Sequence, residues 1–254
     1  MTDPVVTIAV PSFNQGAFLD DALSSIFAQG VAVEVFVLDG GSTDGSVEII
    51  KGWSDRLAGW RSQRDRGQAA AINEGIVRGR APFVAWLNSD DWLLPGALVR
   101  LLETLERAPT APMAYGRTWD IDQTSGRRRA TWVQPFSPRG LAVRCLISQP
   151  GTLMRRSAWE TVGGLDERLH MAMDYDLWWR LYQSGGAPAF TEVFVAVNRV
   201  HEATKTRSRR VDHYREAMEV VRRHAGYLPA KWWLARPYRV WWETLRHQLR
   251  GRRE

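Results

Sequence analysis

Short apolar runs alternate with helical patterns along the first 107 residues of the chain. The apolar runs have the length and β-branched content of buried strands, and they lie at 5–10, 33–38, 57–62 and 83–87. Apolar side chains recur with a helical period in the segments between and after them, at 17–29, 47–53, 69–78 and 95–107. This order predicts a parallel sheet covered by helices.

The second half of the chain is less regular. A hairpin is expected through 115–132, around the turn Thr124-Ser125-Gly126. Further elements are expected as a strand at 151–155, a helix at 175–184 and a strand at 189–197. No internal repeat or low-complexity linker separates the halves, so we expect them to share one sheet.

Composition narrows the class of protein. The 254 residues are 44% hydrophobic, which suits a soluble globular chain with a sizeable core. Cys145 is the only cysteine, so an intrachain disulfide and a thiolate zinc site are both excluded. The first apolar run, Val5 to Val10, is too short for a signal peptide, and no run approaches the roughly 20 residues of a membrane span. We therefore expect a cytoplasmic protein.

The net charge of +6 is concentrated in the C-terminal region. Residues 199–254 carry 15 basic and 6 acidic side chains, a surplus of +9 that leaves −3 for the remainder. Within 228–254 one helical face is apolar: Leu234, Tyr238, Trp241, Trp242, Leu245 and Leu249. A basic helix of this kind either lies on an anionic membrane surface, at the inner face of the cytoplasmic membrane, or packs on the rest of the chain. Nucleic-acid binding is disfavoured, because no zinc-finger, recognition-helix or RNA-binding signature accompanies the charge.

Candidate chemistry lies where the predicted strands end. The run 83–87 stops at Asn88-Ser89-Asp90-Asp91, and hard cations such as Mg²⁺ prefer carboxylate oxygens. Earlier strands end at Pro11-Ser12-Phe13-Asn14 and in the turn-rich segment 39–45. The carboxyl ends of parallel strands meet at one edge, so these loops are expected to line one crevice. Neither Gly-x-Gly-x-x-Gly after a strand nor a P-loop occurs, which disfavours nicotinamide enzymes and P-loop nucleotidases.

The polar residues of these loops suit a nucleoside. Ser12 and Asn14 can bond a ribose or a base, and Asp39 can accept from either. Asn14 is also an ordinary turn residue. For Ser42, Thr43 and Asp44, capping of the helix that starts near Val47 is the preferred interpretation.

An ordered series of motifs resembles the family 2 glycosyltransferases of the GT-A fold. The series covers residues 5–206 and includes Pro11-Ser12-Phe13-Asn14, Leu38-Asp39-Gly40-Gly41-Ser42, Asp65-Arg66-Gly67-Gln68, Asn88-Ser89-Asp90-Asp91, Gly163-Gly164-Leu165-Asp166, Met173-Asp174-Tyr175-Asp176 and His201-Glu202-Ala203-Thr204-Lys205.

The resemblance implies an α/β GT-A fold, with a Rossmann-like, mostly parallel sheet flanked by helices and a basic helical C-terminal extension. The domain would span 1–206, with a nucleotide-sugar half at 1–107, an acceptor and catalytic half at 108–206, and a tryptophan-rich extension at 207–254. It implies a metal-dependent, inverting transferase that uses Mg²⁺ or Mn²⁺. The donor would be a UDP-, GDP- or dTDP-sugar. The acceptor would be a hydroxyl of a glycan or lipid-linked molecule, in cell-surface polysaccharide or glycolipid synthesis.

The resemblance also assigns roles to residues. The nucleoside would be held by Pro11, Ser12, Asn14 and Asp39, and the donor site completed by Asp65, Gly67, Gln68, Asn73, Asn88, Ser89 and Lys205. Asp90 and His201 would bind the metal, and Asp174 would be the general base. Gln149 and Trp178 would border the acceptor.

The sequence departs from the family pattern at three positions. Asn88 stands in place of the usual first aspartate of the metal motif, and Ile72 in place of an arginine before Asn73. Met173 replaces an acidic neighbour of Asp174, which removes a like charge that would raise the pKa of the base.

These departures and the local pattern leave alternatives open. Asp174 could cap its helix, and of Trp178 and Trp179 one is expected in the core. A catalytically silent module that binds a nucleotide sugar or a glycan is the alternative for the chain as a whole.

Overall fold

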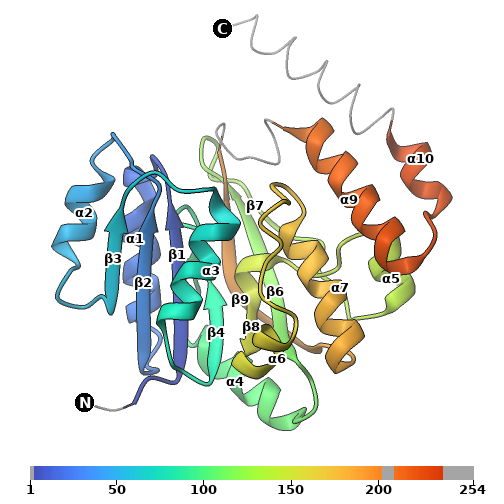
Figure 1. Ribbon diagram of the computed structural model, residues 1–254, viewed down its shortest axis with the longest axis horizontal. Coiled ribbons are helices and arrows are strands. Elements are labelled where there is room, and N and C mark those ends of the chain that lie inside the picture. The colour runs from blue at the N-terminus through green and yellow to red at the C-terminus, as the bar shows by residue number, and fades with distance from the viewer. Residues whose placement is uncertain (1–2, 202–208, 237–254) are drawn as a thin grey trace, which may run out of the picture.

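The computed structural model of the chain describes residues 3–201 and 209–236. Its strands are β1 (Val6–Ser12), β2 (Val33–Asp39), β3 (Gly59–Ser62), β4 (Phe83–Trp86), β5 (Trp92–Leu93), β6 (Met113–Asp122), β7 (Arg128–Ala130), β8 (Thr152–Arg155) and β9 (Ala189–Val200). They form one sheet in the order β3-β2-β1-β4-β8-β6-β9-β5, with β7 paired to β6 (Figure 1). The prediction that both halves share one sheet is confirmed.

Half of the strand pairings are parallel and half are antiparallel. β1 pairs in parallel with β2 and β4, β2 with β3, and β6 with β9. β8 runs antiparallel between β4 and β6, and β5 runs antiparallel at the β9 edge. The expected hairpin is present as β6 and β7, with Gly126 in the left-handed conformation (φ 66°) that the turn requires.

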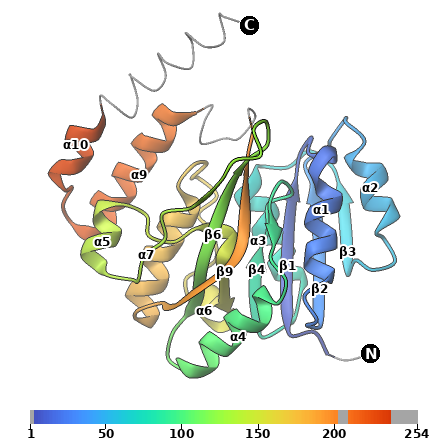
Figure 2. The same cartoon turned by 180° about the vertical axis from the view of Figure 1, so that it is seen from behind.

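Helices cover both faces of the sheet (Figure 1, Figure 2). Their bounds are α1 (Gly16–Phe27), α2 (Ser46–Gly52), α3 (Gln68–Arg78), α4 (Ala97–Arg107), α5 (Pro138–Val143), α6 (Arg156–Thr161), α7 (Met173–Gly185), α9 (Arg210–Ala225) and α10 (Ala230–Arg236), with a 3-10 turn η1 (Gln149–Gly151). α5 and α6 were not predicted, because six residues are too few to display a helical period.

Two apolar cores lie on opposite faces of the sheet. Val6, Ile8 and Val10 of β1 point into the core under α1 and α4, and Ala9 points into the core shared by α3 and α7. Helix α3 approaches β1 closely at Gly75, where a Cβ would come within 2.7 Å of the Ala9 side chain. This close packing holds the second half of α3 against the middle of β1.

The described part of the C-terminal extension is helical and packs on the domain. Ala217 and Val221 of α9 and Trp232 of α10 are buried in the same core as α7. The indole Nε1 of Trp232 donates to the carbonyl of Ala142 in α5 at 2.8 Å. The predicted boundary between 206 and 207 falls among residues that the structure does not describe. Of the described helices, none combines the length and the apolar character needed to cross a bilayer.

Candidate active site

A large pocket opens at the carboxyl ends of the parallel strands. Its volume is about 1690 Å³, and its walls include the segment after β1, the loop before α3, the segment after β4 and the start of α7. Most of the predicted site residues line it: Pro11, Ser12, Asn14, Asp65, Gly67, Gln68, Asn88, Ser89, Asp90, Gln149 and Asp174. The prediction that the strand-end loops face one crevice is confirmed, although segment 39–45 contributes only Gly40 to its wall.

The wall after β1 presents an apolar and a polar group. Ser12 is 5% exposed, and its buried hydroxyl has no hydrogen-bond partner among the described residues. Phe13, next to it, lines the pocket with 60% of its surface exposed. Asn14 has a left-handed backbone (φ 52°), and its Oδ1 accepts from the Thr43 amide. The wall thus offers a ligand one unsatisfied hydroxyl and one aromatic face.

Asp39 lies beneath the pocket rather than in its wall. Its carboxylate is completely buried and accepts from the Gly41 and Ser42 amides and from the Ser42 and Ser62 hydroxyls. Ser42 in turn accepts from the Asn14 amide at 2.7 Å. Asp39 therefore shapes the loops that follow β1 and β2, and its direct contact with a donor stays a prediction.

Asp44 binds the first residue of α2, although the N-cap of that helix is Gly45 and not a residue of segment 42–44. Its carboxylate accepts from the amide and hydroxyl of Ser46, the first residue of α2, and from the Gly16 amide at the start of α1. These bonds hold the pKa of Asp44 below its ordinary value against the opposing effect of burial.

The loop before α3 is held from below by Arg61. Its guanidinium contacts Asp65 and Glu74 and donates to the carbonyl of Asp39. Asp65 accepts from the Gly67 amide at 2.8 Å, which fixes the turn into α3. The loop is therefore shaped before any ligand binds.

Asn88 is the centre of a hydrogen-bond network at the pocket floor. Its Oδ1 accepts from Gln68 Nε2 at 2.7 Å. Its Nδ2 donates to Asp91 Oδ2 and to Gln149 Oε1, both at 3.2 Å. Gln149 donates onward to the carbonyl of Trp86. The network ties the segment after β4 to α3 and to the turn η1.

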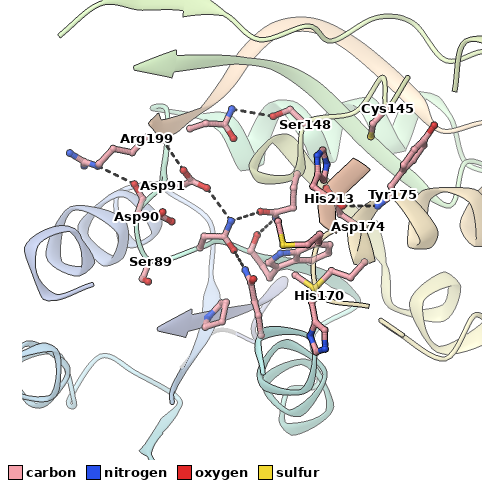
Figure 3. A pocket seen from close by; sticks show the side chains of 18 of the residues that line it. Ser89, Asp90, Asp91, Cys145, Ser148, His170, Asp174, Tyr175, Arg199 and His213 are labelled. Carbon is pink, nitrogen blue, oxygen red and sulfur yellow. Dashed lines mark hydrogen bonds between the residues drawn. The ribbon is translucent and has the colours of Figure 1, made fainter. Parts of the chain in front are cut away.

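Asp90 and His201 meet although 111 residues separate them in sequence. Asp90 Oδ2 lies 3.0 Å from His201 Nε2, with 20% and 11% of the two side chains exposed. Asp91 points the other way: it accepts from the Arg199 amide, and burial together with the charge of Asp90 raises its pKa (Figure 3). Among the described residues no cluster of three or more His, Cys, Asp or Glu side chains is present. The two side chains that meet here are one carboxylate and one imidazole, which makes them candidate metal ligands.

Asp174 lies across the pocket from Asp90, as Figure 3 shows. It is the second residue of α7, and the N-cap is Ala172, so the interpretation of Asp174 as the N-cap is wrong. Burial raises the pKa of its carboxyl from 3.8 to about 6, although the bond from the Tyr175 amide works in the opposite direction. A carboxyl with this pKa is mostly ionised at pH 7 and can take up a proton.

Several predicted site residues do not reach the pocket. Trp178 is completely buried and stacks on Trp86 with ring centroids 5.8 Å apart, so its prediction as an acceptor contact is wrong. Trp179 is buried as well. Asn73 is absent from the pocket wall, because its amide exchanges hydrogen bonds with the Leu165 backbone and supports the turn at 163–167. Lys205 lies outside the described residues.

Other pocket residues were missed by sequence reasoning. Trp132 follows β7 and lines the pocket with 53% of its surface exposed, and the Arg144 guanidinium lies 5.2 Å from its ring centre. Arg210, His213 and Lys231 of α9 and α10 also line it. None belongs to a motif, and only the fold brings them to the site.

The family of the chain follows from comparison with known proteins. The sequence profile of glycosyl transferase family 2 matches residues 7–161. The chain belongs to glycosyl transferase family 2.

Curated relatives extend the similarity beyond this region. Chondroitin synthase of Escherichia coli is 24% identical over 216 residues, which are 84% of this chain and 31% of that protein. The succinoglycan biosynthesis protein ExoU of Rhizobium meliloti is 32% identical over 200 residues, which are 71% of this chain and 57% of that protein. The chain thus spans less than two thirds of the length of each of these relatives.

Solved structures show the same GT-A fold at low sequence identity. Residues 1–349 of Staphylococcus aureus TarS, in complex with UDP-GlcNAc, superpose with a TM-score of 0.69 at 16% identity, over 85% of this chain and 65% of that one. The mannosyltransferase PcManGT of Pyrobaculum calidifontis, in complex with GDP-Man and Mn²⁺, superposes with a TM-score of 0.65 at 20% identity, over 86% of this chain and 65% of that one.

The structure accounts for two departures from the family 2 pattern. An aspartate at 88 would place a carboxylate against Asp91 Oδ2 and Gln149 Oε1, two acceptors to which the Asn88 amide donates. With Met173 beside it, Asp174 has no like charge at the preceding position, yet burial alone raises the pKa of its carboxyl.

Proposed function

We propose that the chain transfers a sugar from a nucleotide-sugar donor to a hydroxyl group of a glycan acceptor, with inversion at the anomeric carbon. The observation that carries this proposal is a single pocket in which the strand-end loops face a carboxyl, Asp174, with a pKa of about 6. The volume of about 1690 Å³ exceeds the roughly 300–1,000 Å³ of a pocket for one small ligand, as two substrates require.

The nucleoside of the donor would lie on the wall after β1. The unsatisfied Ser12 hydroxyl supplies a hydrogen bond, and the exposed ring of Phe13 supplies a surface on which a base can stack. The complexes of TarS with UDP-GlcNAc and of PcManGT with GDP-Man support a donor of this class. They do not select a base, so UDP-, GDP- and dTDP-sugars all belong to the proposal.

The pair Asp90 and His201 fits a divalent cation that also binds the donor diphosphate. Carboxylate oxygen and imidazole nitrogen suit Mn²⁺, and carboxylate oxygen suits Mg²⁺. Both side chains are mostly buried and meet at 3.0 Å from distant parts of the chain, a geometry that one shared cation would satisfy. A bound Mg²⁺ or Mn²⁺ would offset the charge that develops on the leaving diphosphate.

Asp174 is the proposed general base. Its carboxylate would accept the proton of the acceptor hydroxyl while the hydroxyl oxygen bonds to the anomeric carbon of the donor. The bond from that carbon to the diphosphate oxygen breaks, and the nucleoside diphosphate leaves with the electron pair. Because attack and departure occur on opposite faces of the sugar ring, the configuration inverts without a covalent enzyme intermediate.

This role predicts an acidic limb near pH 6 in the rate of transfer. The base acts when ionised, so kcat should fall about tenfold per pH unit below the pKa of about 6 and level off above it. The measurement is kcat at saturating donor and acceptor between pH 4.5 and 8. A limb near pH 4, the ordinary range of an aspartate, would show that the titrating base is not the buried Asp174.

The acceptor would approach from the side of Trp132 and Gln149. Chondroitin synthase and ExoU support a glycan acceptor and a role in polysaccharide assembly. A ring such as Trp132, half exposed in the pocket, offers an apolar face to a sugar. Trp132→Ala is expected to raise the acceptor KM about threefold to tenfold, the usual worth of an aromatic contact. The donor KM is the internal control, and an unchanged acceptor KM would remove Trp132 from the acceptor site.

We further propose a cytoplasmic location with contact to the inner face of the membrane. Of the predicted membrane segment 228–254, the structure describes α10, where Trp233 and Leu234 are 51% and 80% exposed while Trp232 is buried. A Trp233→Ser, Leu234→Ser double variant should sediment less with anionic vesicles than the wild type does. Equal sedimentation of the two proteins would count against this contact.

A screen of donors tests the proposed function against the silent-module alternative. UDP-, GDP- and dTDP-sugars are added with and without Mn²⁺, and the melting temperature is followed. A rise with one nucleotide class, together with turnover of that donor, supports the transferase. Stabilisation without any turnover, in the presence of candidate glycan and lipid-linked acceptors, would favour the silent module.

A further inference from the structure

A carboxylate of the C-terminal extension holds the chain just before the proposed base. Glu216 of α9 accepts three backbone hydrogen bonds through one oxygen, Oε2, from His170 (3.1 Å), Met171 (2.7 Å) and Ala172 (3.1 Å). The helix that follows, α7, carries Asp174 as its second residue. Glu216 therefore fixes the backbone two residues from the carboxyl that takes up the proton.

The start of α7 has no local substitute for this carboxylate. Its N-cap is Ala172, which has no side-chain oxygen, and no side-chain cap bond is formed there. Most helices use Ser, Thr, Asp or Asn at this position to bind free amides. Bonds from amides to an ionised carboxylate are shorter and stronger than neutral ones, so a single distant glutamate can order the segment.

A second set of contacts joins the same two helices further along. Asp176 of α7 is 1% exposed and accepts from His224 Nε2 of α9 at 2.8 Å and from Arg180 Nε at 2.7 Å. Burial opposes its ionisation, but the bonds from His224 and Arg180 hold the pKa of Asp176 below its ordinary value. Ala217 and Val221 of α9 are also buried in the core shared with α7. Helix α9 is therefore fixed to the helix that carries Asp174 at two places, near Glu216 and near His224.

Helix α9 also contributes directly to the wall of the pocket. Residue His201, which contacts Asp90, precedes α9 by one short segment of chain, and α9 supplies His213 and Ala217 to the pocket wall. The region matched by the family profile ends at residue 161, before α7 and α9 begin. Glu216, which holds the segment just before Asp174, therefore lies outside the region that the family profile matches.

We propose that Glu216 is a positioning residue for Asp174: it holds the segment 170–172 so that the base faces the acceptor hydroxyl. The inference rests on the proposed function. It predicts that loss of Glu216 impairs the chemical step and leaves donor binding intact, because the nucleoside wall and the Asp90–His201 pair make no contact with Glu216 among the described residues.

The test uses two variants of Glu216 and one matched control. Glu216→Ala removes the acceptor oxygen, and Glu216→Gln keeps an oxygen but removes the charge. Glu219→Ala is the control, since Glu219 is an exposed glutamate one turn further along α9. For each full-length protein, donor-binding sites are counted by titration calorimetry, kcat is expressed per donor-binding site, and hydrogen exchange is followed at the amides of 170–172.

In Glu216→Ala we expect faster exchange at these amides, an unchanged donor Kd and a kcat per site lowered by about tenfold to 10²-fold, the usual effect of a misplaced catalytic group. Glu216→Gln should lie between this variant and the wild type, and it keeps the test open if Glu216→Ala does not fold. Glu219→Ala should match the wild type. Faster exchange with an unchanged kcat per site would overturn the inference, because Glu216 would then only stabilise the fold. A wild-type chain that binds no nucleotide sugar would instead overturn the proposed function.

Discussion

Replacing Asp174 by asparagine is expected to lower the rate of sugar transfer by about 10²–10⁴-fold, the usual contribution of a general base. Asparagine has nearly the same shape but cannot take up the proton of the acceptor hydroxyl. Its amide should fit the same site at the start of α7, where the carboxyl accepts one bond from the Tyr175 amide. The loss should therefore appear in kcat, and the donor Kd should change by less than about twofold.

Donor affinity and pH dependence make this prediction specific. Titration of the donor into Asp174→Asn separates a loss of chemistry from a loss of binding or folding. The residual activity should also lack the acidic limb near pH 6, because the group that titrates there has been removed. A variant that keeps more than about a tenth of the wild-type kcat would show that another group takes the proton.

Asp90→Ala is the second substitution with a large expected effect. The variant removes the carboxylate that meets His201 at 3.0 Å, so Mn²⁺ should no longer add to the stabilisation by the donor. Transfer should fall by about 10²-fold or more, since a metal typically offsets several kcal/mol of charge in the transition state. Chelation of the metal in the wild type should have the same effect as the substitution.

Two further variants and one control test whether the effect of Asp90→Ala comes from the metal site. His201→Ala should lose the same Mn²⁺ dependence, and the Asp90→Ala, His201→Ala double variant should lose little more, as expected for two groups that act on one ion. Asp55→Ala, at an exposed aspartate away from the pocket, is the matched control. Mn²⁺-dependent donor stabilisation that survives in Asp90→Ala would contradict the assignment of the metal ligands.

The sequence predicts the parallel half of the fold well because each element there has a strong pattern. The strands β1, β2 and β4 are mostly buried on both faces and consist mainly of apolar residues, and polar loops follow them directly. The position of Ser12, Asn88 and Asp90 at one sheet edge follows from this order alone. A prediction of these strands therefore also identifies the residues at their carboxyl ends as candidate site residues.

Predictions of site residues fail where a side chain near the pocket can point either into it or into the protein interior. Asn73 is polar and close to the sheet edge, but its side-chain amide exchanges hydrogen bonds with the Leu165 backbone and supports the turn at 163–167. Trp178 stands in a helix with apolar side chains on most of its surface, so the pattern does not say which face meets the pocket.

The meeting of Asp90 with His201 was expected from the resemblance, but contacts between distant segments that belong to no motif could not be predicted. Glu216 reaches the amides of 170–172 across more than forty residues, and Trp132 enters the pocket from a strand-end segment without a motif. Both depend on how α9 and the β6–β7 hairpin pack, which no local pattern records. The fold must be known before these residues can be connected to the chemistry.

The configuration of the sugar first released from the donor tests the central claim most directly. Many transferases slowly transfer sugar to water, and proton NMR can follow this reaction without a known acceptor. From an α-linked donor the wild type should release the β-anomer first, before mutarotation, and Asp174→Asn should release it at least about 10²-fold more slowly. Release of the α-anomer first, or equal rates in the two proteins, would contradict direct displacement with Asp174 as the base.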